Sequence, residues 1–186
     1  MQYYKRYRME LDLVQQPVES PVLPENYLWL PWQADRLEIH ASVKSQSFRH
    51  EVDSHVFPCL ADYYGCLRLM QEIALQRTFC PQATWLVGYQ TADHGIIECG
   101  TIQGICPSDY LGSIQNVGVI PGHRRLGIGK ALVLKSIEGF RVAGRKRATL
   151  EVTATNFSAV ELYRSLGFCI TRTMYREAID DSLLST

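Results

Sequence analysis

The sequence has no excess of charge of either sign, because its 186 residues carry 19 Lys and Arg against 19 Asp and Glu. A nucleic-acid-binding domain usually carries a basic excess, so this composition predicts no nucleic-acid partner. No run of about 18 apolar residues is present, so no membrane-spanning helix is predicted. The first residues, MQYYKRYRMELDL, contain no continuous apolar stretch of the signal-peptide type. We therefore expect a cytoplasmic protein with no membrane partner.

The sequence also lacks the cysteine patterns of a metal or redox site. None of its six cysteines belongs to a CxxC pair, and no group of His and Cys has the spacing of zinc ligands. Their neighbours are apolar, and a free cysteine in such surroundings behaves as a small hydrophobic residue. We therefore predict no metal, and six reduced thiols in or near the core: Cys59, Cys66, Cys80, Cys99, Cys106 and Cys169.

Apolar residues make up 46% of the chain and charged residues 20%, as in ordinary globular proteins. The length suits one well-packed domain, which we predict to span residues 1–186. Residues 1–32 begin it with a strand and a loop that contains prolines. Apolar periodicity predicts strands over Tyr3–Leu13, Tyr27–Trp32, Thr84–Gln90, Ile96–Ile105, Ser113–Ile120, Ala148–Thr153 and Phe168–Arg176. It predicts helices over Arg36–Phe48, Asp62–Arg77, Gly127–Val142 and Phe157–Leu166.

The most informative segment runs from Val117 to Leu132, where a strand enters a turn rich in Gly and Arg that opens a helix. Unpaired N–H groups and the helix dipole make such a helix start an anion site, and glycines let a diphosphate approach the backbone. The Walker A pattern fails, because Ile128 stands where it requires Lys. The dinucleotide pattern GxGxxG fails as well, because Leu132 stands where its third glycine is required.

The pattern Arg-x-x-Gly-x-Gly does fit, over Arg124–Gly129. It resembles the coenzyme A diphosphate loop of the GNAT acyltransferase superfamily. Downstream, Asn156 opens a helix that carries Leu-Tyr and ends in Gly167-Phe168, which is similar to the strand–helix signature of the same superfamily. The resemblance covers residues 84–176, which are the most diagnostic part of the chain.

The resemblance implies a single α/β domain with a mixed, mostly antiparallel sheet and helices on both faces. It also implies a V-shaped splay between the strands that contain Ser113–Ile120 and Ala148–Thr153. Acetyl-CoA is then the cosubstrate, and its pantetheine arm fills the gap between the two strands. The residues expected to bind it are Val117, Gly118, Val119, Arg124, Arg125, Leu126, Gly127, Ile128, Gly129, Lys130 and Asn156. Packing remains an alternative role for Gly118, and helix capping remains one for Asn156.

Amine acetylation needs a neutral amine and a protonated leaving thiolate. Tyr163 matches the tyrosine that acts as general acid in the superfamily, although a purely packing role remains an alternative. Glu151 precedes it by twelve residues, which is similar to the glutamate–tyrosine spacing of the ribosomal-protein alanine acetyltransferases. We predict Glu151 as the base, against the alternative of a solvent-facing carboxylate, and Glu98 is a second candidate. Ser113 occupies another position where the family places a base, and serine is a poor base.

The resemblance implies an acceptor that is a small-molecule or peptide amine, and the sequence does not identify it. His50 and His55 lie in a polar loop where the superfamily builds its acceptor site, and His123 borders the predicted diphosphate turn. The alternative function is a catalytically inactive sensor or scaffold that binds coenzyme A. Whether the chain forms a homodimer is left open by the sequence.

Overall fold

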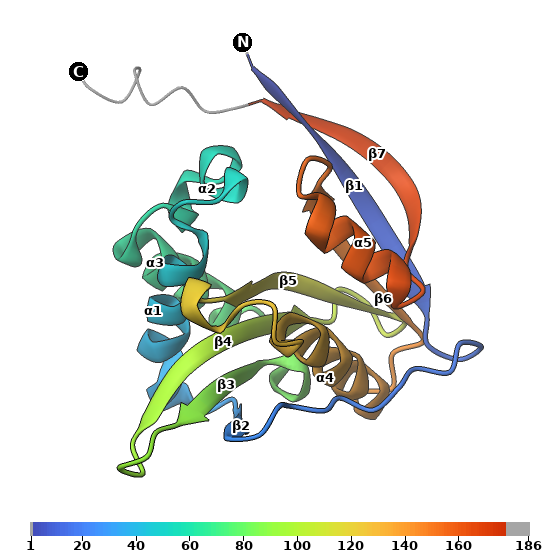
Figure 1. The fold of residues 1–186 in the computed structure, drawn as a ribbon. Coiled ribbons are helices and arrows are strands. Elements are labelled where there is room, and N and C mark those ends of the chain that lie inside the picture. Colours follow the sequence, from blue (N-terminus) through green and yellow to red (C-terminus); the bar gives the residue numbers. More distant parts are fainter. Residues whose placement is uncertain (1, 178–186) are drawn as a thin grey trace.

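The computed structural model describes residues 2–177 and has one seven-stranded sheet with helices on both faces (Figure 1). Met1 and residues 178–186, which the predicted single domain includes, lie outside the described residues. The strands are β1 (Tyr3–Asp12), β2 (Tyr27–Pro31), β3 (Trp85–Gln90), β4 (Ile96–Ile105), β5 (Leu111–Val119), β6 (Arg147–Thr153) and β7 (Cys169–Glu177). The helices are α1 (Leu37–Phe48), α2 (Val52–Val56), α3 (Tyr63–Leu75), α4 (Ile128–Val142) and α5 (Phe157–Ser165). Short 3-10 turns cover Ala34–Arg36, Pro58–Leu60, Pro81–Ala83 and Pro121–His123.

The strand order is β2-β3-β4-β5-β6-β1-β7, and every neighbouring pair is antiparallel except β5 and β6. The parallel pair is joined only over Leu111–Ser113 of β5, opposite 147–149 of β6. Beyond Ser113 the two strands separate, which confirms the predicted splay. A bulge at Gln115, opposite the step from Gln103 to Gly104 in β4, accompanies the separation, as expected because bulges bend a strand.

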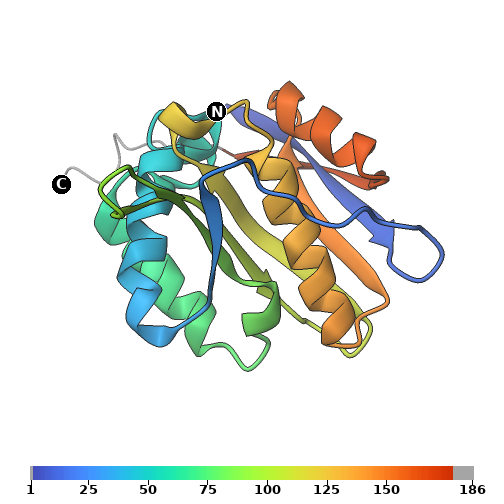
Figure 2. The same cartoon turned by 60° about the horizontal axis from the view of Figure 1, so that its bottom comes forward.

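Alternation along β4 shows why both faces of the sheet carry helices. A Cβ at Gly100 would meet Leu132 and Ile128 of α4, whereas its neighbour Thr101 bonds to His40 of α1. Successive residues of a strand point to opposite faces, so α1 and α4 lie on opposite sides of the same strands (Figure 2). The main core lies under α4 and α5, and a smaller apolar cluster joins α1 to α3.

The structure confirms the predicted order of helices and strands, and it adds two features. Residues 52–56, expected to be polar loop, form the short helix α2. The N-terminal strand β1 lies in the sheet between β6 and β7, a position that its own sequence did not indicate (Figure 1). Because of this insertion, side chains from both ends of the chain meet at one part of the sheet.

Two further predictions can be compared with the described residues. No helix within residues 2–177 is long and apolar enough to span a bilayer. All six cysteines are free, and five are buried or half-buried, but Cys169 is exposed at the start of β7.

Candidate active site

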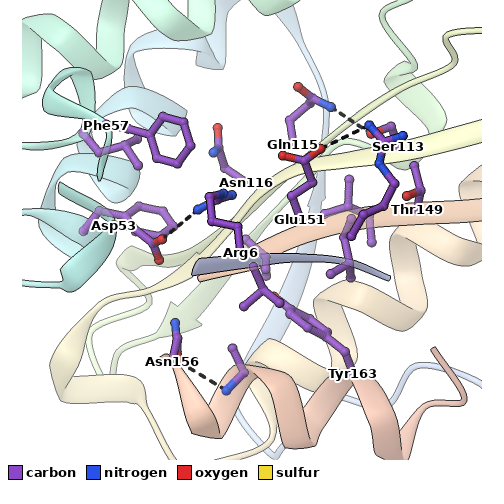
Figure 3. Close-up of a pocket in the computed structure, with 18 of the residues that line it drawn as sticks. Arg6, Asp53, Phe57, Ser113, Gln115, Asn116, Thr149, Glu151, Asn156 and Tyr163 are labelled. Atoms are coloured by element: carbon purple, nitrogen blue, oxygen red, sulfur yellow. Dashed lines mark hydrogen bonds and ion pairs between the residues drawn. The ribbon is translucent and has the colours of Figure 1, made fainter. Parts of the chain in front are cut away.

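A cavity of about 450 Å³ lies where β5 and β6 separate. Its walls come from β1, β5, β6 and α5, together with α3 and the segment from α2 to the turn at Pro58–Leu60 (Figure 3). The cavity is lined on both sides of the gap, by residues of β5 and β6 and by Asn156, Ala159 and Tyr163 at α5. We refer to it as the cleft.

Among residues 2–177, no strand pairs with the edge of β5 that faces the cleft over residues 116–119, because β6 pairs only as far as Ser113. The opposite edge of these residues is hydrogen-bonded to β4. The backbone N–H and C=O groups at the edge of a sheet need hydrogen-bond partners. An extended ligand can provide these hydrogen bonds by lying along the edge as an added strand would. Val117 lines the cleft, while a Cβ at Gly118 would meet Ser47 at 2.8 Å and Phe48 at 3.0 Å on α1. Packing against α1 therefore explains the glycine at this position.

The turn between β5 and α4 has the backbone of an anion site. Gly127, the residue before α4, adopts φ +82°, a left-handed conformation that suits glycine, and Arg125 adopts φ +64°. No side chain caps α4, so the first N–H groups of this helix have no side-chain partner. Ile128 is buried and anchors the helix start, whereas Leu126 is exposed. Within residues 121–130, the predicted phosphate turn therefore has both the conformation and the free donors that anion binding requires.

The basic side chains of this turn differ in what they contact. Arg124 donates through Nε to the Val119 carbonyl at 2.9 Å and through a terminal nitrogen to the Ser47 carbonyl at 2.9 Å. It also forms an ion pair of 2.6 Å with Glu51. Its guanidinium thus joins the end of β5 to the end of α1. Lys130 pairs with Glu19 at 2.6 Å, and Arg125 has no recorded partner within the described chain.

Tyr163 projects from α5 into the cleft, and only 6% of its surface is exposed (Figure 3). Its hydroxyl makes no hydrogen bond to another described residue. Burial raises the pKa of Tyr163 well above its usual value, and the nearby carboxylate of Asp53 raises it further. The phenol is therefore protonated throughout the physiological pH range and holds a proton that it can donate.

Glu151 of β6 lines the same cleft and is about 40% exposed at its side chain. One of its oxygens lies 3.2 Å from a terminal nitrogen of Arg8 on β1. The cross-strand register explains the contact, because Arg8 and Glu151 stand directly opposite each other. The structure therefore brings the two predicted catalytic side chains, Glu151 and Tyr163, into one cavity.

Sequence reasoning missed a second pair of charges in the cleft, formed by Arg6 of β1 and Asp53 of α2. Their side chains approach to 3.6 Å, and Thr153 joins them by accepting from Arg6 at 2.8 Å and donating to Asp53 at 2.8 Å. Arg6 is also stacked over the ring of Phe57 at 4.6 Å, and burial lowers its pKa. The alternation of Arg6 and Arg8 with apolar neighbours was visible in the sequence, but the location of β1 was not.

The buried amine of Lys44 contacts Asn116, one of the polar residues that line the cleft. Asn116 lines the cleft and accepts a hydrogen bond of 3.0 Å from Lys44 of α1, whose side chain is fully buried. Burial lowers the pKa of Lys44 to about 8. No carboxylate pairs with Lys44 within the described residues, and its ammonium donates to the side-chain oxygen of Asn116 and, at 3.9 Å, to the sulfur of Met70.

The other residues singled out by sequence lie in several places. Asn156 lines the cleft and caps α5 by accepting from the Ala159 amide at 3.3 Å, so capping accounts for part of its role. Ser113 lines the cleft, whereas Glu98 lines a separate hollow beside α1. His123 bonds to the Tyr27 hydroxyl at 2.7 Å outside the cleft. His50 and His55 do not line the cleft, although Asp53 between them does.

Among the residues that the structure describes, no group of three or more His, Cys, Asp or Glu is placed to hold a metal ion. The cleft instead offers an unpaired strand edge, a protonated tyrosine and a carboxylate, and the start of α4 that follows β5 along the chain has no side-chain cap. Such a strand edge and helix start suit an extended ligand that carries phosphate, and the tyrosine and the carboxylate suit proton transfer.

Comparisons with known proteins agree with this arrangement. The model of the acetyltransferase (GNAT) family matches residues 54–168. A mycothiol acetyltransferase of Nocardiopsis dassonvillei is 31% identical over 176 residues, which cover 89% of this chain and 53% of that protein. The [ribosomal protein bS18]-alanine N-acetyltransferase of Escherichia coli is 42% identical over 56 residues, which cover 30% of this chain and 38% of that protein.

A crystal structure of a GCN5-related N-acetyltransferase from Sphaerobacter thermophilus has the same fold, with a TM-score of 0.67 at 22% identity. The similarity covers 95% of this chain and 53% of that one. The chain thus spans about half the length of these longer relatives.

Proposed function

The chain belongs to the GNAT acetyltransferase family, and from this premise we propose that it transfers the acetyl group of acetyl-CoA to a primary amine. Transfer occurs by direct attack while both substrates are bound. The observation that carries the proposal is that Glu151 and Tyr163 line the same cleft as the unpaired edge of β5. Alternatives based on other nucleotides are disfavoured by the failed Walker and dinucleotide patterns.

The cosubstrate would lie along β5, with its diphosphate at the start of α4. Binding groups there are the backbone of Gly127 and Gly129, with charge supplied by Arg125 and Lys130. The pantetheine arm would pair with the edge of β5 that β6 leaves unpaired, apart from the Val119 carbonyl, which already accepts from Arg124. Arg124 contributes by fixing the end of β5 rather than by direct contact with phosphate.

Glu151 accepts the proton that the acceptor ammonium loses, directly or through a water. The neutral amine then attacks the thioester carbonyl, so that a C–N bond forms and the C–S bond breaks. The nitrogen, which still carries two hydrogens after the attack, releases its second proton to solvent and becomes the amide. Tyr163 donates its proton to the departing sulfur, since its burial keeps the phenol protonated. Product release and exchange with solvent restore both side chains.

The proposal is tested by incubating the purified protein with acetyl-CoA and a panel of amines, and by measuring thiol release and the mass of the product. Tyr163→Phe should lower kcat by about 10²- to 10⁴-fold, the usual contribution of a general acid. Tyr64→Phe is a matched control, because Tyr64 is 70% exposed on α3. Unchanged turnover in Tyr163→Phe would contradict the assigned role.

The alternative is a sensor or scaffold that binds coenzyme A without turnover. The presence of both Glu151 and the unpaired Tyr163 hydroxyl in the cleft argues against it. The same assay separates the two functions, because a sensor would bind acetyl-CoA and release no thiol with any amine.

A further inference from the structure

The part of the cleft that lies toward β1 has two chemically different walls. One wall is apolar and consists of side chains from the segment 57–60 and from α3: Phe57, Cys59, Leu60, Leu69 and Ile73. The other wall carries the charges of β1, β6 and α2, namely Arg6, Arg8, Glu151 and Asp53. Figure 3 shows Arg6, Asp53 and Glu151 among the side chains that line the cleft. A ligand of this region must therefore have an apolar part and must satisfy fixed charges.

The four charges of this wall form two pairs that balance each other. Arg6 pairs with Asp53 at 3.6 Å, with side-chain exposures of 8% and 17%. Arg8 pairs with Glu151 at 3.2 Å, with exposures of 41% and 40%. If the ammonium group of a ligand paired with one of these carboxylates, the arginine that now pairs with that carboxylate would lose its partner. Leaving a shielded charge unpaired is costly, and the cost is greatest for the more buried Arg6.

Two further arginines give this region a positive excess. Arg172 of β7 stands directly opposite Arg8, and like charges in opposite positions destabilise a sheet. Arg176 lies over the ring of Phe57 at 4.2 Å, on the strand next to Arg6. Within residues 2–177, neither has an acidic group at ion-pair distance. Arg172 and Arg176 do not line the cleft themselves, but with Arg6 and Arg8 they place four arginines on β1 and β7 beside its two carboxylates, Glu151 and Asp53.

We propose that the acceptor is a small amine that also carries an anionic group and an apolar part, as an apolar amino acid does. Its ammonium is recognised by Glu151 or Asp53, and its anion by the arginines of β1 and β7. Such a ligand exchanges partners with the existing ion pairs and leaves no charge of the wall unpaired. This inference rests on the proposed function, and it narrows the substrate class of the same site.

The anion can be a carboxylate or a phosphate, because arginine forms two parallel hydrogen bonds with either. The test therefore compares acceptor pairs in which one member carries the anionic group and the other lacks it. Leucine is compared with leucinamide for the carboxylate, and O-phosphoethanolamine with ethanolamine for the phosphate. Spermidine is added as an amine of several positive charges.

We expect kcat/KM for the anionic member of one pair to exceed that of its neutral partner by about 10- to 100-fold, the range for hydrogen bonds between charged groups. The pair in which the anionic member is the better acceptor shows whether the site binds a carboxylate or a phosphate. The amide is a stringent comparison, because its amine loses a proton more readily than that of leucine and is favoured by chemistry alone.

The double variant Arg172→Gln/Arg176→Gln should reduce this preference several-fold, whereas Arg172→Lys/Arg176→Lys should retain most of it. Arg77→Gln is the control, since Arg77 is exposed beyond the end of α3 and outside the cleft. Thermal unfolding of each variant shows whether the fold is kept, as expected for exposed side chains of an edge strand.

Equal transfer to both members of each pair, or better transfer to the neutral amine or spermidine, would overturn this inference and leave the proposed function intact. A preference for the anion that survives in the glutamine variant would overturn the assignment to β7. Transfer to none of the amines would contradict the proposed function and this inference with it.

Discussion

Replacing Arg124 with methionine should destabilise the protein even when no cofactor is bound. The guanidinium donates to the carbonyl oxygens of Val119 and Ser47 and pairs with Glu51, so one side chain joins β5, α1 and the segment before α2. Methionine retains most of the length of the side chain and none of its donors. The substitution therefore tests the hydrogen bonds rather than the packing.

The expected loss follows from these contacts. Hydrogen bonds of a charged donor contribute about 1.5–3 kcal/mol each when shielded from water. The Arg124 side chain is 36% exposed, which reduces this contribution, and the exposed pair with Glu51 adds at most about 1 kcal/mol. We expect a loss of about 2 kcal/mol in the free energy of unfolding, or about 4–8 °C in Tm for a chain of this size.

Urea and thermal unfolding without ligand measure this loss. Arg125→Met in the same turn is the matched control, because Arg125 has no recorded partner in the described chain, and it should change stability little. Arg124→Lys should not restore stability, since one ammonium cannot reach three acceptors that a planar fork contacts together. If Arg124→Met had normal stability and lost only acetyl-CoA affinity, the arginine would serve the diphosphate and our reasoning would be refuted.

Three more outcomes are expected. Glu151→Gln should lower kcat/KM by about 10²-fold at neutral pH, with recovery at higher pH where the amine loses its proton unaided; a flat loss across pH would contradict the base assignment. Burial lowers the pKa of His40 to about 3 in the folded protein, whereas the unfolded chain takes up this proton near pH 6.5. The folded state is therefore most stable above pH 6.5 and loses stability as the pH falls toward 3. At pH 5 this proton uptake lowers the free energy of unfolding by about 2 kcal/mol. His40→Gln should show a shallower acid slope in urea unfolding. Gly118→Ala should lower the free energy of unfolding, measured with urea, by about 1–3 kcal/mol, because the new Cβ would meet Ser47 at 2.8 Å. Unchanged stability would contradict this, since it would mean that α1 shifts away at no cost.

Periodicity and glycine positions were sufficient to predict most elements. The helix α4 ends at Val142, as predicted, and Gly144 beyond it adopts the left-handed φ of +77° that suits a residue after a helix end. The strand before the phosphate turn and the helix after it were predicted from the same local signals. These helices and strands could be predicted because each depends on residues within a few positions of one another in the chain.

Contacts between distant segments could not be predicted in this way. Nothing in Tyr3–Asp12 specifies that this strand lies between β6 and β7, so the contributions of Arg6 and Arg8 to the cleft were missed. The short helix α2 has five residues, too few for periodicity, and so Asp53 was missed as well. The contacts of Arg124 with Ser47 and Glu51 could not be predicted either, because these residues lie more than 70 positions away in the chain.

The most direct test of this account is thermal unfolding with and without acetyl-CoA, with ATP and NAD as controls. A ligand at 100 times its Kd adds about 2.7 kcal/mol, or about 5–11 °C in Tm. We predict this shift for acetyl-CoA alone. It should be lost in Gly127→Val, which strains a residue at φ +82°, and kept in Gly122→Ala, where a Cβ meets nothing within 4 Å. No shift at millimolar acetyl-CoA in the unaltered protein would contradict the assignment of the cleft.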